Sequence, residues 1–291
     1  MKVDLLIVNY NSTDSLLVCL ASIHTVFPFS GFNIWVWDNH SNDNPSRIPH
    51  RFPNVKFLSD GRNIGFGAAV NRLISKSKAP YVMLLNPDTF FNGGSLLDVL
   101  TYFDEHPDVG VIGLRILNPD GSLQESARSF PNILSGLFGR TSLLTRLFPR
   151  NRFSRKNLLS GAVEESGATV EADWVSGACM IIKRKAIEAV GEMDERFFMY
   201  WEDADWCRRM WEKRWRVVYL PAVSLCHSVG QSSRTRAIRS ILEFHKSAYR
   251  LYEKYARGYQ IPLKPLVFWI LAMRFYIKAI KIILCSMRHN K

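Results

Sequence analysis

The segment FFMYWEDADWCRR, at positions 197–209, places three carboxylates directly after four aromatic side chains. These acids are Glu202, Asp203 and Asp205, and the helical periodicity from 203 onward puts them at a helix N-terminus. The positive end of the helix dipole favours their ionised forms, whereas burial against aromatic rings raises their pKa. A carboxylate under both influences can be ionised at neutral pH and still accept a proton from a substrate hydroxyl. Helix capping alone would account for one acid, but less well for three.

A further acid, Asp88, follows an apolar run in the segment LLNPDTF, where Pro87 fixes the backbone before it. A lone carboxylate in this position could hold a divalent metal through substrate phosphates, because magnesium sites often use one or two protein carboxylates. His227, which follows the strand-like segment VVYLPAVSLC, is a candidate second ligand. Each residue has a structural alternative: Asp88 could open a turn or cap a helix, and His227 could serve the fold alone.

Glycines 65 and 67 in the segment GRNIGFGAAVN allow the backbone to approach a ligand closely at a predicted helix start. Exposed N–H groups at such a start favour phosphate oxygens, and Arg62 could add a positive charge. The segment does not match the dinucleotide-binding fingerprint, because Val70 stands where a third glycine is needed. A plain turn at the start of a helix is the alternative interpretation.

The elements that must position these residues alternate between apolar runs and helix-like stretches. The pattern predicts strands over 3–8, 33–37, 55–58, 81–85, 109–114, 178–182 and 217–226, and helices over 14–25, 65–78, 95–105 and 184–190. Such alternation is typical of an α/β fold with a mostly parallel central sheet flanked by helices on both faces. The sequence NPDGS at 118–122 predicts a tight turn, and 139–156 a long basic loop.

Polar clusters follow the first four predicted strands. They are Asn9, Tyr10, Asn11 and Ser12; Asp38, Asn39 and Ser41; Asp60, Arg62 and Asn63; and Asn86 and Asp88. Ligands of open α/β sheets bind at the carboxyl ends of the strands, so these clusters predict one binding site along a single edge of the sheet. Polar residues also terminate strands for no functional reason, but four clusters in succession favour a site.

The chain of 291 residues is 47% hydrophobic and 22% charged, as expected of a globular protein with a sizeable core. Its net charge of +12 predicts anionic partners, which could be nucleic acid, anionic lipid or phosphorylated substrates. The five cysteines form no CxxC pair, which indicates reduced thiols in a cytoplasmic enzyme. The N-terminal segment MKVDLLIVNYN has a short apolar run and no cleavage site, so we expect no signal peptide.

Residues 263–288 are mostly apolar and long enough to span a membrane, but three cations argue against a span. Arg274, Lys278 and Lys281 fall at i, i+4 and i+7 and therefore form one stripe on a helix. We expect an amphipathic helix lying in the membrane interface, with its basic side toward anionic headgroups. A helix packed on the domain is the alternative. The stretch 234–257 is predicted to be a basic helix that leads to it.

Seven motifs occur in the order seen in family 2 glycosyltransferases of the GT-A fold: IVNYNS, VWDNHSND, RNIGFGAAVN, LNPD, WVSGACMIIKR, DERFFMYWEDADWCRR and HSVGQSS. The resemblance covers residues 3–235 and is greatest to bacterial rhamnosyltransferases. It implies an inverting transfer of a sugar, expected to be L-rhamnose from dTDP-L-rhamnose, with a UDP-sugar as the alternative donor. It also implies a GT-A domain over 1–232, with a nucleotide-sugar half over 1–115 and an acceptor half over 116–232. A basic helical membrane-associating tail over 233–291 would follow.

The resemblance also implies roles for individual residues. Asp203 would be the catalytic base, with Glu202 beside it, and Asp88 and His227 would hold Mg2+ or Mn2+. Asn86 stands where the family's DxD motif has its first acid, which leaves Asp88 as the acid of that motif. The donor-binding set would be Asn9, Tyr10, Asn11, Asp38, Arg62, Asn63, Gly65, Asn86 and Asp88. The acceptor side would be lined by Trp174, Ser176, Gly177 and Trp201.

The residue types agree with that chemistry, because an inverting transfer is a single in-line displacement. It needs one base for the acceptor hydroxyl and positive charge for the departing nucleotide diphosphate. The expected acceptor is a polyprenyl-diphosphate-linked sugar or a polysaccharide of the cell envelope, used by a peripheral enzyme at the cytoplasmic face of the inner or plasma membrane.

Two other classes of protein are compatible with the charge: a nucleic-acid-binding protein and a non-catalytic membrane scaffold. Nucleic-acid binding would require aromatic side chains interleaved with cations on one surface. Most of the tryptophans here lie in strand-like or acid-rich stretches instead. We therefore expect no nucleic-acid partner.

Overall fold

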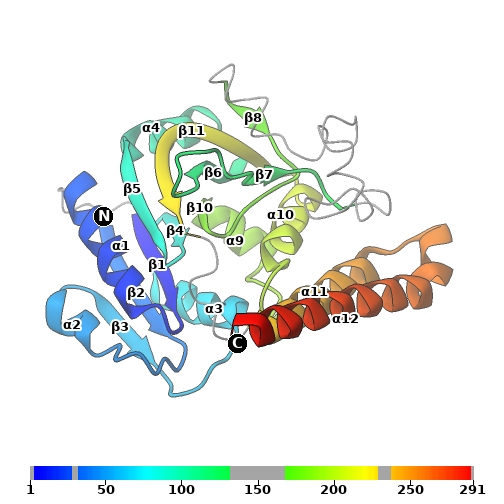
Figure 1. Cartoon of the computed structure of the whole chain (residues 1–291). Helices are drawn as coiled ribbons and strands as arrows, with labels where there is room; N and C mark the ends of the chain where they lie inside the picture. Colours follow the sequence, from blue (N-terminus) through cyan, green and yellow to red (C-terminus); the bar gives the residue numbers. More distant parts are fainter. Residues whose placement is uncertain (1–2, 28–31, 132–167, 229–236, 290–291) are drawn as a thin grey trace.

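The computed structural model describes residues 3–27, 32–131, 168–228 and 237–289 (Figure 1). The strands in this part of the chain are β1 (Val3–Asn9), β2 (Phe32–Asp38), β3 (Lys56–Ser59), β4 (Tyr81–Leu85), β5 (Thr89–Gly94), β6 (Val109–Leu117), β7 (Ala127–Arg128), β8 (Val170–Glu171), β9 (Trp174–Val175), β10 (Cys179–Lys183) and β11 (Arg216–His227). The helices are α1 (Thr13–Val26), α2 (Arg47–Arg51), α3 (Phe66–Lys76), α4 (Leu96–Glu105), α9 (Arg184–Val190), α10 (Glu202–Glu212), α11 (Ala237–Tyr255) and α12 (Lys264–His289), with the short 3-10 helix η2 (Gly258–Leu263) before α12.

Most of these strands form one sheet in the order β3-β2-β1-β4-β10-β6-β11-β5, with β8 paired to β11. β1 runs parallel to β2 and β4, β2 to β3, and β6 to β11. β10 lies antiparallel between β4 and β6, while β5 and β8 each pair antiparallel with β11. The predicted mostly parallel sheet is therefore confirmed.

Helices cover both faces of the sheet, as the alternating pattern predicts (Figure 1). Successive residues of β1 enter two different apolar clusters: Leu5 and Ile7 belong to one, and Leu6 and Val8 to the other. Alternate side chains of a strand point to opposite faces, so the two clusters are the two halves of the core. The first cluster takes its helical residues from α1, α2 and α4, and the second takes them from α3, α9, α10 and α11.

The arrangement of β5 and β10 is the part of the sheet that the pattern did not predict. The run at 178–182 was expected as a strand and forms β10, but it inserts antiparallel between β4 and β6. β5 begins at Thr89, directly after the Asn-Pro-Asp turn, and ends in two glycines, so its sequence lacks the apolar alternation that marks a strand. It forms because the edge of β11 offers it backbone hydrogen-bond partners.

The predicted turn at 118–122 is present at the end of β6, where the N–H of Asn118 donates to the carbonyl of Ser122 at 2.7 Å. The predicted basic loop at 139–156 lies outside the described residues.

The predicted basic helix before the tail forms α11, and part of its polar surface faces the protein rather than solvent. The hydroxyl of Ser247 donates to the carbonyl of Met199 at 2.9 Å. The ammonium of Lys254 lies 2.8 Å from a carboxylate oxygen of Asp194 and 2.6 Å from one of Asp205. α11 is therefore anchored on the chain that leads into α10, and part of its charge is neutralised there.

The last helix, α12, packs on α11 with one side and leaves an apolar side exposed. Ring contacts join the two helices, with centroids 5.4 Å apart for Tyr249 and Phe268 and 6.2 Å apart for His245 and Phe275. The large exposed apolar side chains of α12 are Leu266, Phe268, Trp269, Ile270, Met273, Tyr276, Ile277, Ile280, Ile283 and Leu284. Across the described residues, we find no helix whose length and apolar character would suffice to cross a membrane.

Candidate active site

The carboxylate of Asp203 lies at the first turn of α10 and is held by two backbone N–H groups. Gly177 donates to Oδ2 at 3.0 Å, and Ala204 donates to Oδ1 at 2.8 Å. Burial raises the pKa of Asp203, while these two N–H groups and the charge of Arg128 act in the opposite direction. Asp203 therefore combines a fixed orientation with a raised affinity for a proton, which are the two properties of a general base.

Glu202, the residue before it, is more deeply buried. Glu202 is 6% exposed, and its Oε2 has no hydrogen-bond partner among the described residues. Burial, and next the charge of Asp203, hold the pKa of Glu202 well above its usual range. For this acid, desolvation outweighs the helix dipole.

The backbone that leads into α10 is strained at two consecutive aromatic residues. Tyr200 and Trp201 have φ of 69° and 68°, a left-handed conformation that bulky residues rarely adopt. Packing holds them there: the ring of Trp201 lies 5.4 Å from that of Phe244 in α11 and 6.0 Å from that of Trp174, and Tyr200 shares a 2.5 Å hydrogen bond with Ser240. Such strain persists only where the surroundings enforce it, and it is often found at functional sites.

The third acid of the segment, Asp205, has a structural role. It is fully buried, forms an ion pair with Arg209 at 3.0 Å and with Lys254 at 2.6 Å, and accepts a hydrogen bond from the hydroxyl of Tyr255 at 2.8 Å. Asp205 therefore joins α10 to α11 and has no oxygen left to serve a substrate.

A second group of polar side chains lies where β4 ends and β11 ends. Nε2 of His227 is 3.2 Å from Oδ1 of Asp88 and 3.2 Å from Nδ2 of Asn86. Nδ1 of the same ring is 2.7 Å from Oε1 of Gln124. Asp88 and His227 are both buried, so the structure brings the two predicted metal ligands together.

The Asp88–His227 pair fits a divalent cation only as a partial ligand set. No cluster of three or more His, Cys, Asp or Glu side chains suited to a metal occurs in the described part of the chain. Magnesium and manganese accept such sparse protein ligation when substrate phosphates complete the coordination. Asp88 and His227 therefore suit a cation that arrives with a nucleotide diphosphate rather than one held permanently by protein ligands.

Hydrogen bonds join the polar ends of β1 and β2. Nδ2 of Asn9 donates to Oδ1 of Asp38 at 2.9 Å and to the hydroxyl of Ser41 at 3.1 Å. The N–H of Asn11 donates to the same hydroxyl at 2.9 Å, and Tyr10 lies half-buried between the two asparagines. Asn9 is fully buried, so it holds Asp38 in place, whereas Tyr10 and Asn11 retain surface for a ligand.

The end of β2 is joined in turn to the loop before α3. Nδ2 of Asn39 donates to Oδ1 of Asn63 at 3.1 Å, and the N–H of Gly65 donates to that same oxygen at 3.1 Å. Arg62 is exposed and pairs with Asp60 at 3.4 Å. Hydrogen bonds thus join the ends of β1 and β2 to the loop before α3, with the N–H of Asn39 donating to the carbonyl of Asn9 at 2.8 Å. The fourth predicted cluster, at Asn86 and Asp88, contacts His227 and Ala178 instead.

The start of α3 is in direct contact with the strained segment before α10. The N–H of Phe66 donates to the carbonyl of Phe198 at 2.8 Å. Gly65 has a φ of 88°, and a Cβ there would lie 2.6 Å from that carbonyl oxygen. Only glycine fits, because both the backbone angle and the space exclude a side chain. The predicted donor loop and the predicted catalytic helix are thus fixed to one another.

The predicted acceptor-side segment lies between the two groups of functional side chains. Trp174 is buried and donates to the carbonyl of Ser129 at 3.0 Å, and the hydroxyl of Ser176 accepts from the N–H of Ala178 at 3.3 Å. Gly177 holds Asp203, while the carbonyl of the next residue, Ala178, accepts from the N–H of Asn86 at 2.9 Å. One turn of backbone therefore contacts both the predicted base and the predicted metal-binding segment.

Two residues near these groups were not predicted from the sequence. Gln124 contacts His227, and Arg128 lies with its guanidinium carbon 5.2 Å from the ring centre of Trp174. Gln124 follows a tight turn, which is the one signal that marks its position. Arg128 stands in a stretch of poor periodicity and carries no local signal at all.

The fold is the GT-A fold of glycosyltransferases. The structure resembles that of a mannosyltransferase from Pyrobaculum calidifontis solved with GDP-Man and Mn2+, with a TM-score of 0.59 and 15% identity over 91% of this chain and 68% of that one. At that identity the likeness concerns the fold alone.

Residues 4–191 match the family described as Glycosyl transferase family 2, and the chain belongs to that family. It is 32% identical over 256 residues to the N-acetylglucosaminyl-diphospho-decaprenol L-rhamnosyltransferase of Mycobacterium tuberculosis, covering 82% of this chain and 81% of the relative. It is also 24% identical over 227 residues to the rhamnosyltransferase WbbL of Escherichia coli, covering 75% of this chain and 81% of the relative. The expected class of enzyme is confirmed.

Proposed function

We propose that the protein transfers an L-rhamnosyl group from dTDP-L-rhamnose to a polyprenyl-diphosphate-linked sugar in cell-envelope glycan synthesis, with inversion at the anomeric carbon. The main observation behind the site assignment is the turn at 176–178. Within it, Gly177 contacts Asp203 and the next residue, Ala178, contacts Asn86. An in-line displacement requires the base and the leaving diphosphate to act on one sugar from opposite sides. Groups held by one turn lie in one site, which supports their action on one substrate.

In this proposal Asp203 removes the proton from the acceptor hydroxyl as the new glycosidic bond forms. The N–H of Gly177 keeps Oδ2 oriented, so the carboxylate does not have to reorganise during the reaction. The raised pKa of Asp203 increases its driving force as a base. Burial and the charge of Asp203 raise the pKa of Glu202 well above its usual range, which favours the neutral form of Glu202 beside the base.

Asp88 and His227 would hold Mg2+ or Mn2+ together with the diphosphate of the donor. A bound cation would neutralise the charge that develops on the leaving group. The network from Asn9 through Asp38 and Asn39 to Asn63 would shape the nucleoside end of the donor site. The choice of rhamnose as the sugar is supported by the names of the mycobacterial and Escherichia coli relatives. The choice of dTDP as its carrier rests on the family resemblance, and UDP-sugars are the second candidate donors.

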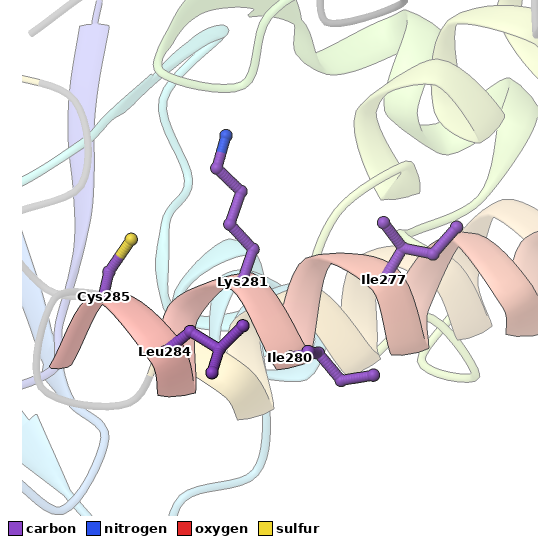
Figure 2. Close-up of a pocket in the computed structure, with 5 residues that line it drawn as sticks. All are labelled: Ile277, Ile280, Lys281, Leu284 and Cys285. Carbon is purple, nitrogen blue, oxygen red and sulfur yellow. The ribbon is translucent and has the colours of Figure 1, made fainter. Parts of the chain in front are cut away.

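The acceptor proposal is supported by the name of the mycobacterial relative and by the exposed side of α12. Trp269 is 68% exposed, and Ile277 is 60% exposed. Figure 2 shows Lys281 projecting from the same helix, beside a cavity of about 300 Å³ whose lining residues are Ile277, Ile280, Lys281, Leu284 and Cys285. Of the three cations on this helix, Lys281 is exposed, whereas Arg274 and Lys278 are half-buried and Lys278 lies 6.0 Å from the ring centre of Phe244 in α11. An exposed apolar side with Lys281 beside it supports a helix at the interface of an anionic membrane.

We therefore propose that residues 1–232 form the transferase unit, and that 233–291 form a membrane-associating unit that acts at the cytoplasmic face of the membrane. α11 would serve both, because it packs on α12 and is anchored on the segment that leads into α10. A lipid-linked acceptor and a peripheral enzyme would then meet at one surface.

The test of the reaction uses the purified full chain, Mg2+ or Mn2+, and vesicles that carry decaprenyl-diphosphate-linked GlcNAc. A panel of nucleotide sugars is supplied, and the product is identified by mass spectrometry and NMR. We expect rhamnosyl transfer from dTDP-L-rhamnose with inverted anomeric configuration. Transfer from a UDP-sugar alone would favour the second candidate donor, and retained configuration would overturn the mechanism.

The test of membrane association is flotation with vesicles of phosphatidylcholine, with and without phosphatidylglycerol. We expect the wild type to float with anionic vesicles and the triple variant Trp269→Glu, Ile277→Glu, Ile280→Glu to remain at the bottom. The matched control places three glutamates at exposed uncharged positions of α1 and α4, at Val18, Leu97 and Thr101, and we expect it to float as the wild type does. Equal flotation of the wild type and the α12 variant would show that α12 does not make the membrane contact.

A further inference from the structure

The imidazole of His227 is held at both of its nitrogens. Nδ1 lies 2.7 Å from Oε1 of Gln124, and Nε2 lies 3.2 Å from both Nδ2 of Asn86 and Oδ1 of Asp88. Gln124 and His227 are each 7% exposed, so water does not replace these partners. The protonation pattern of the ring is therefore decided by the groups that face it.

The orientation of the Gln124 side chain is fixed by two further acceptors. Its Nε2 donates to Oδ1 of Asn118 at 3.0 Å and to the backbone carbonyl of His227 at 3.4 Å. A flipped amide would set its oxygen against both of these oxygens. Oε1 must therefore face the imidazole, and because a carbonyl oxygen only accepts, Nδ1 of His227 must carry the proton.

The backbone supports the same orientation. Gln124 follows the turn at 118–122, and its N–H donates to the carbonyl of Ile116 at 2.8 Å. Within the turn, the amide of Asn118 donates to the hydroxyl of Ser122 at 2.9 Å, which presents Oδ1 of Asn118 to Gln124. The turn after β6 thus acts through Gln124 on a histidine at the end of β11.

With its proton on Nδ1, the neutral ring has a lone pair on Nε2. That lone pair faces the carboxylate of Asp88 and accepts a hydrogen bond from the amide of Asn86. Two electron-rich atoms at 3.2 Å repel each other, and a cation that binds both would relieve the repulsion. Histidines that bind metals usually donate their other ring N–H to an acceptor in this way.

We propose that Gln124 is a positioning residue that fixes His227 in the tautomer protonated at Nδ1, so that Nε2 and Asp88 together receive a divalent cation. The metal part of this inference rests on the proposed function, whereas the tautomer part rests on the contacts of Gln124 alone. Gln124 does not touch the substrate. Its effect is carried entirely by the imidazole that it orients.

The first test reads the tautomer directly, without metal or donor. The protein is labelled with 15N-histidine, and long-range 1H–15N NMR spectra are recorded at alkaline pH, where an ordinary imidazole is neutral. The His227 signals are assigned by comparison with His227→Asn. We expect the proton on Nδ1 in the wild type and a mixture of tautomers in Gln124→Leu. A proton on Nε2 in the wild type, or an unchanged pattern in Gln124→Leu, would overturn the proposal.

The second test measures Mn2+ affinity in the presence of dTDP, by the loss of the free-ion EPR signal. We expect Gln124→Leu to weaken Mn2+ binding by about 10- to 100-fold, as for other outer partners of metal-binding histidines. Gln124→Glu keeps an acceptor for Nδ1 but sets its second oxygen against Oδ1 of Asn118 and the carbonyl of His227, so it should recover only part of the affinity. The matched control is Ser126→Ala, which removes a nearby buried hydroxyl that bonds to Leu114 instead, and we expect it to bind as the wild type does.

The two tests separate the two claims. If wild-type His227 has its proton on Nδ1 and Gln124→Leu loses that preference, the positioning role stands, even if Mn2+ proves not to bind at His227. In that case only the metal assignment of the proposed function is wrong. If Gln124→Leu does not fold, as judged by thermal unfolding, Gln124→Met provides the same loss of the acceptor with a flexible apolar chain. If the wild type binds Mn2+ at His227 and all Gln124 variants bind Mn2+ with the same affinity, the proposal is contradicted.

Discussion

The backbone N–H of Gly177 donates to Oδ2 of Asp203 at 3.0 Å. The carbonyl of the next residue, Ala178, accepts from the N–H of Asn86 at 2.9 Å, two residues before Asp88. The base and the metal-binding segment come from sequence positions more than a hundred residues apart, yet they share one turn as their support. A small displacement of this turn would move both groups, so the geometry of the reaction depends on it.

The charge of Arg128 is expected to shift the pH at which transfer is lost on the acid side of the pH–rate profile. Asp203 is active as a carboxylate, so transfer is lost as the pH falls through its pKa, which lies above the ordinary value. The charge of Arg128 lowers that pKa, and Arg128→Ala should therefore raise it and move the acid limb to higher pH. The measurement is kcat/KM for rhamnosyl transfer against pH. Arg128→Lys keeps the charge and should resemble the wild type, and identical acid limbs for all three proteins would contradict the assignment.

Glu202 is expected to make the stability of the protein fall as the pH rises. Its pKa in the folded state lies well above its unfolded value, so the unfolded chain releases this proton at lower pH than the folded one. The folded state is therefore favoured below the unfolded pKa and loses stability between the two pKa values. Glu202→Gln removes this dependence, and we expect its gain in melting temperature over the wild type to grow from acidic to neutral pH. A constant difference in melting temperature across that range would refute the burial argument.

Gly65→Ala is expected to destabilise the protein more than Gly61→Ala. Both glycines have positive φ, of 88° and 75°, so each alanine costs about 1–3 kcal/mol in backbone strain. A Cβ at 61 meets nothing within 4 Å, whereas one at 65 lies 2.6 Å from the carbonyl oxygen of Phe198. The overlap should bring the total cost at 65 to about 2–5 kcal/mol. Urea unfolding of the two variants measures the difference, and equal costs would show that the contact with Phe198 is absent.

Asp205→Asn is expected to reduce the free energy of unfolding by about 3–5 kcal/mol, because it removes the buried carboxylate that pairs with Arg209 and leaves Lys254 paired with Asp194 alone. The control is Asp14→Asn, which breaks the ion pair with Arg47 at a side chain that is 87% exposed, and it should cost less than about 1 kcal/mol. Urea unfolding compares the two. Similar costs would mean that Asp205 does not anchor α11.

The hydrophobic pattern predicted the central elements well, because strands buried on both faces are continuous apolar runs. β1 is buried at every position, and the run 81–85 coincides with β4. The same pattern holds no information on strand direction, so the insertion of β10 between β4 and β6 could not be predicted from it. β5 was missed because its two terminal glycines resemble a loop, and its pairing with β11 is a long-range contact.

The candidate site was predictable where its residues lie at the ends of strands, as Asp38 does at the end of β2 and Asn86 and Asp88 do after β4. Gln124 was not, because its role depends on a contact with His227, 103 residues away. In the sequence, Lys254 is one of many cations in a basic stretch. In the fold, it pairs with Asp194 and Asp205. Charge counted along a sequence does not show which cations are neutralised by tertiary contacts.

The most direct test of the account is the rate of single-turnover sugar transfer by Asp203→Asn, measured together with the affinity for the nucleotide-sugar donor. Asparagine keeps an oxygen for the Gly177 N–H but cannot take a proton from the acceptor. We expect the rate to fall by about 10²–10⁴-fold while the donor dissociation constant stays within about threefold of the wild-type value. Transfer at the wild-type rate by a variant with normal donor affinity would contradict the assignment of Asp203 as the base.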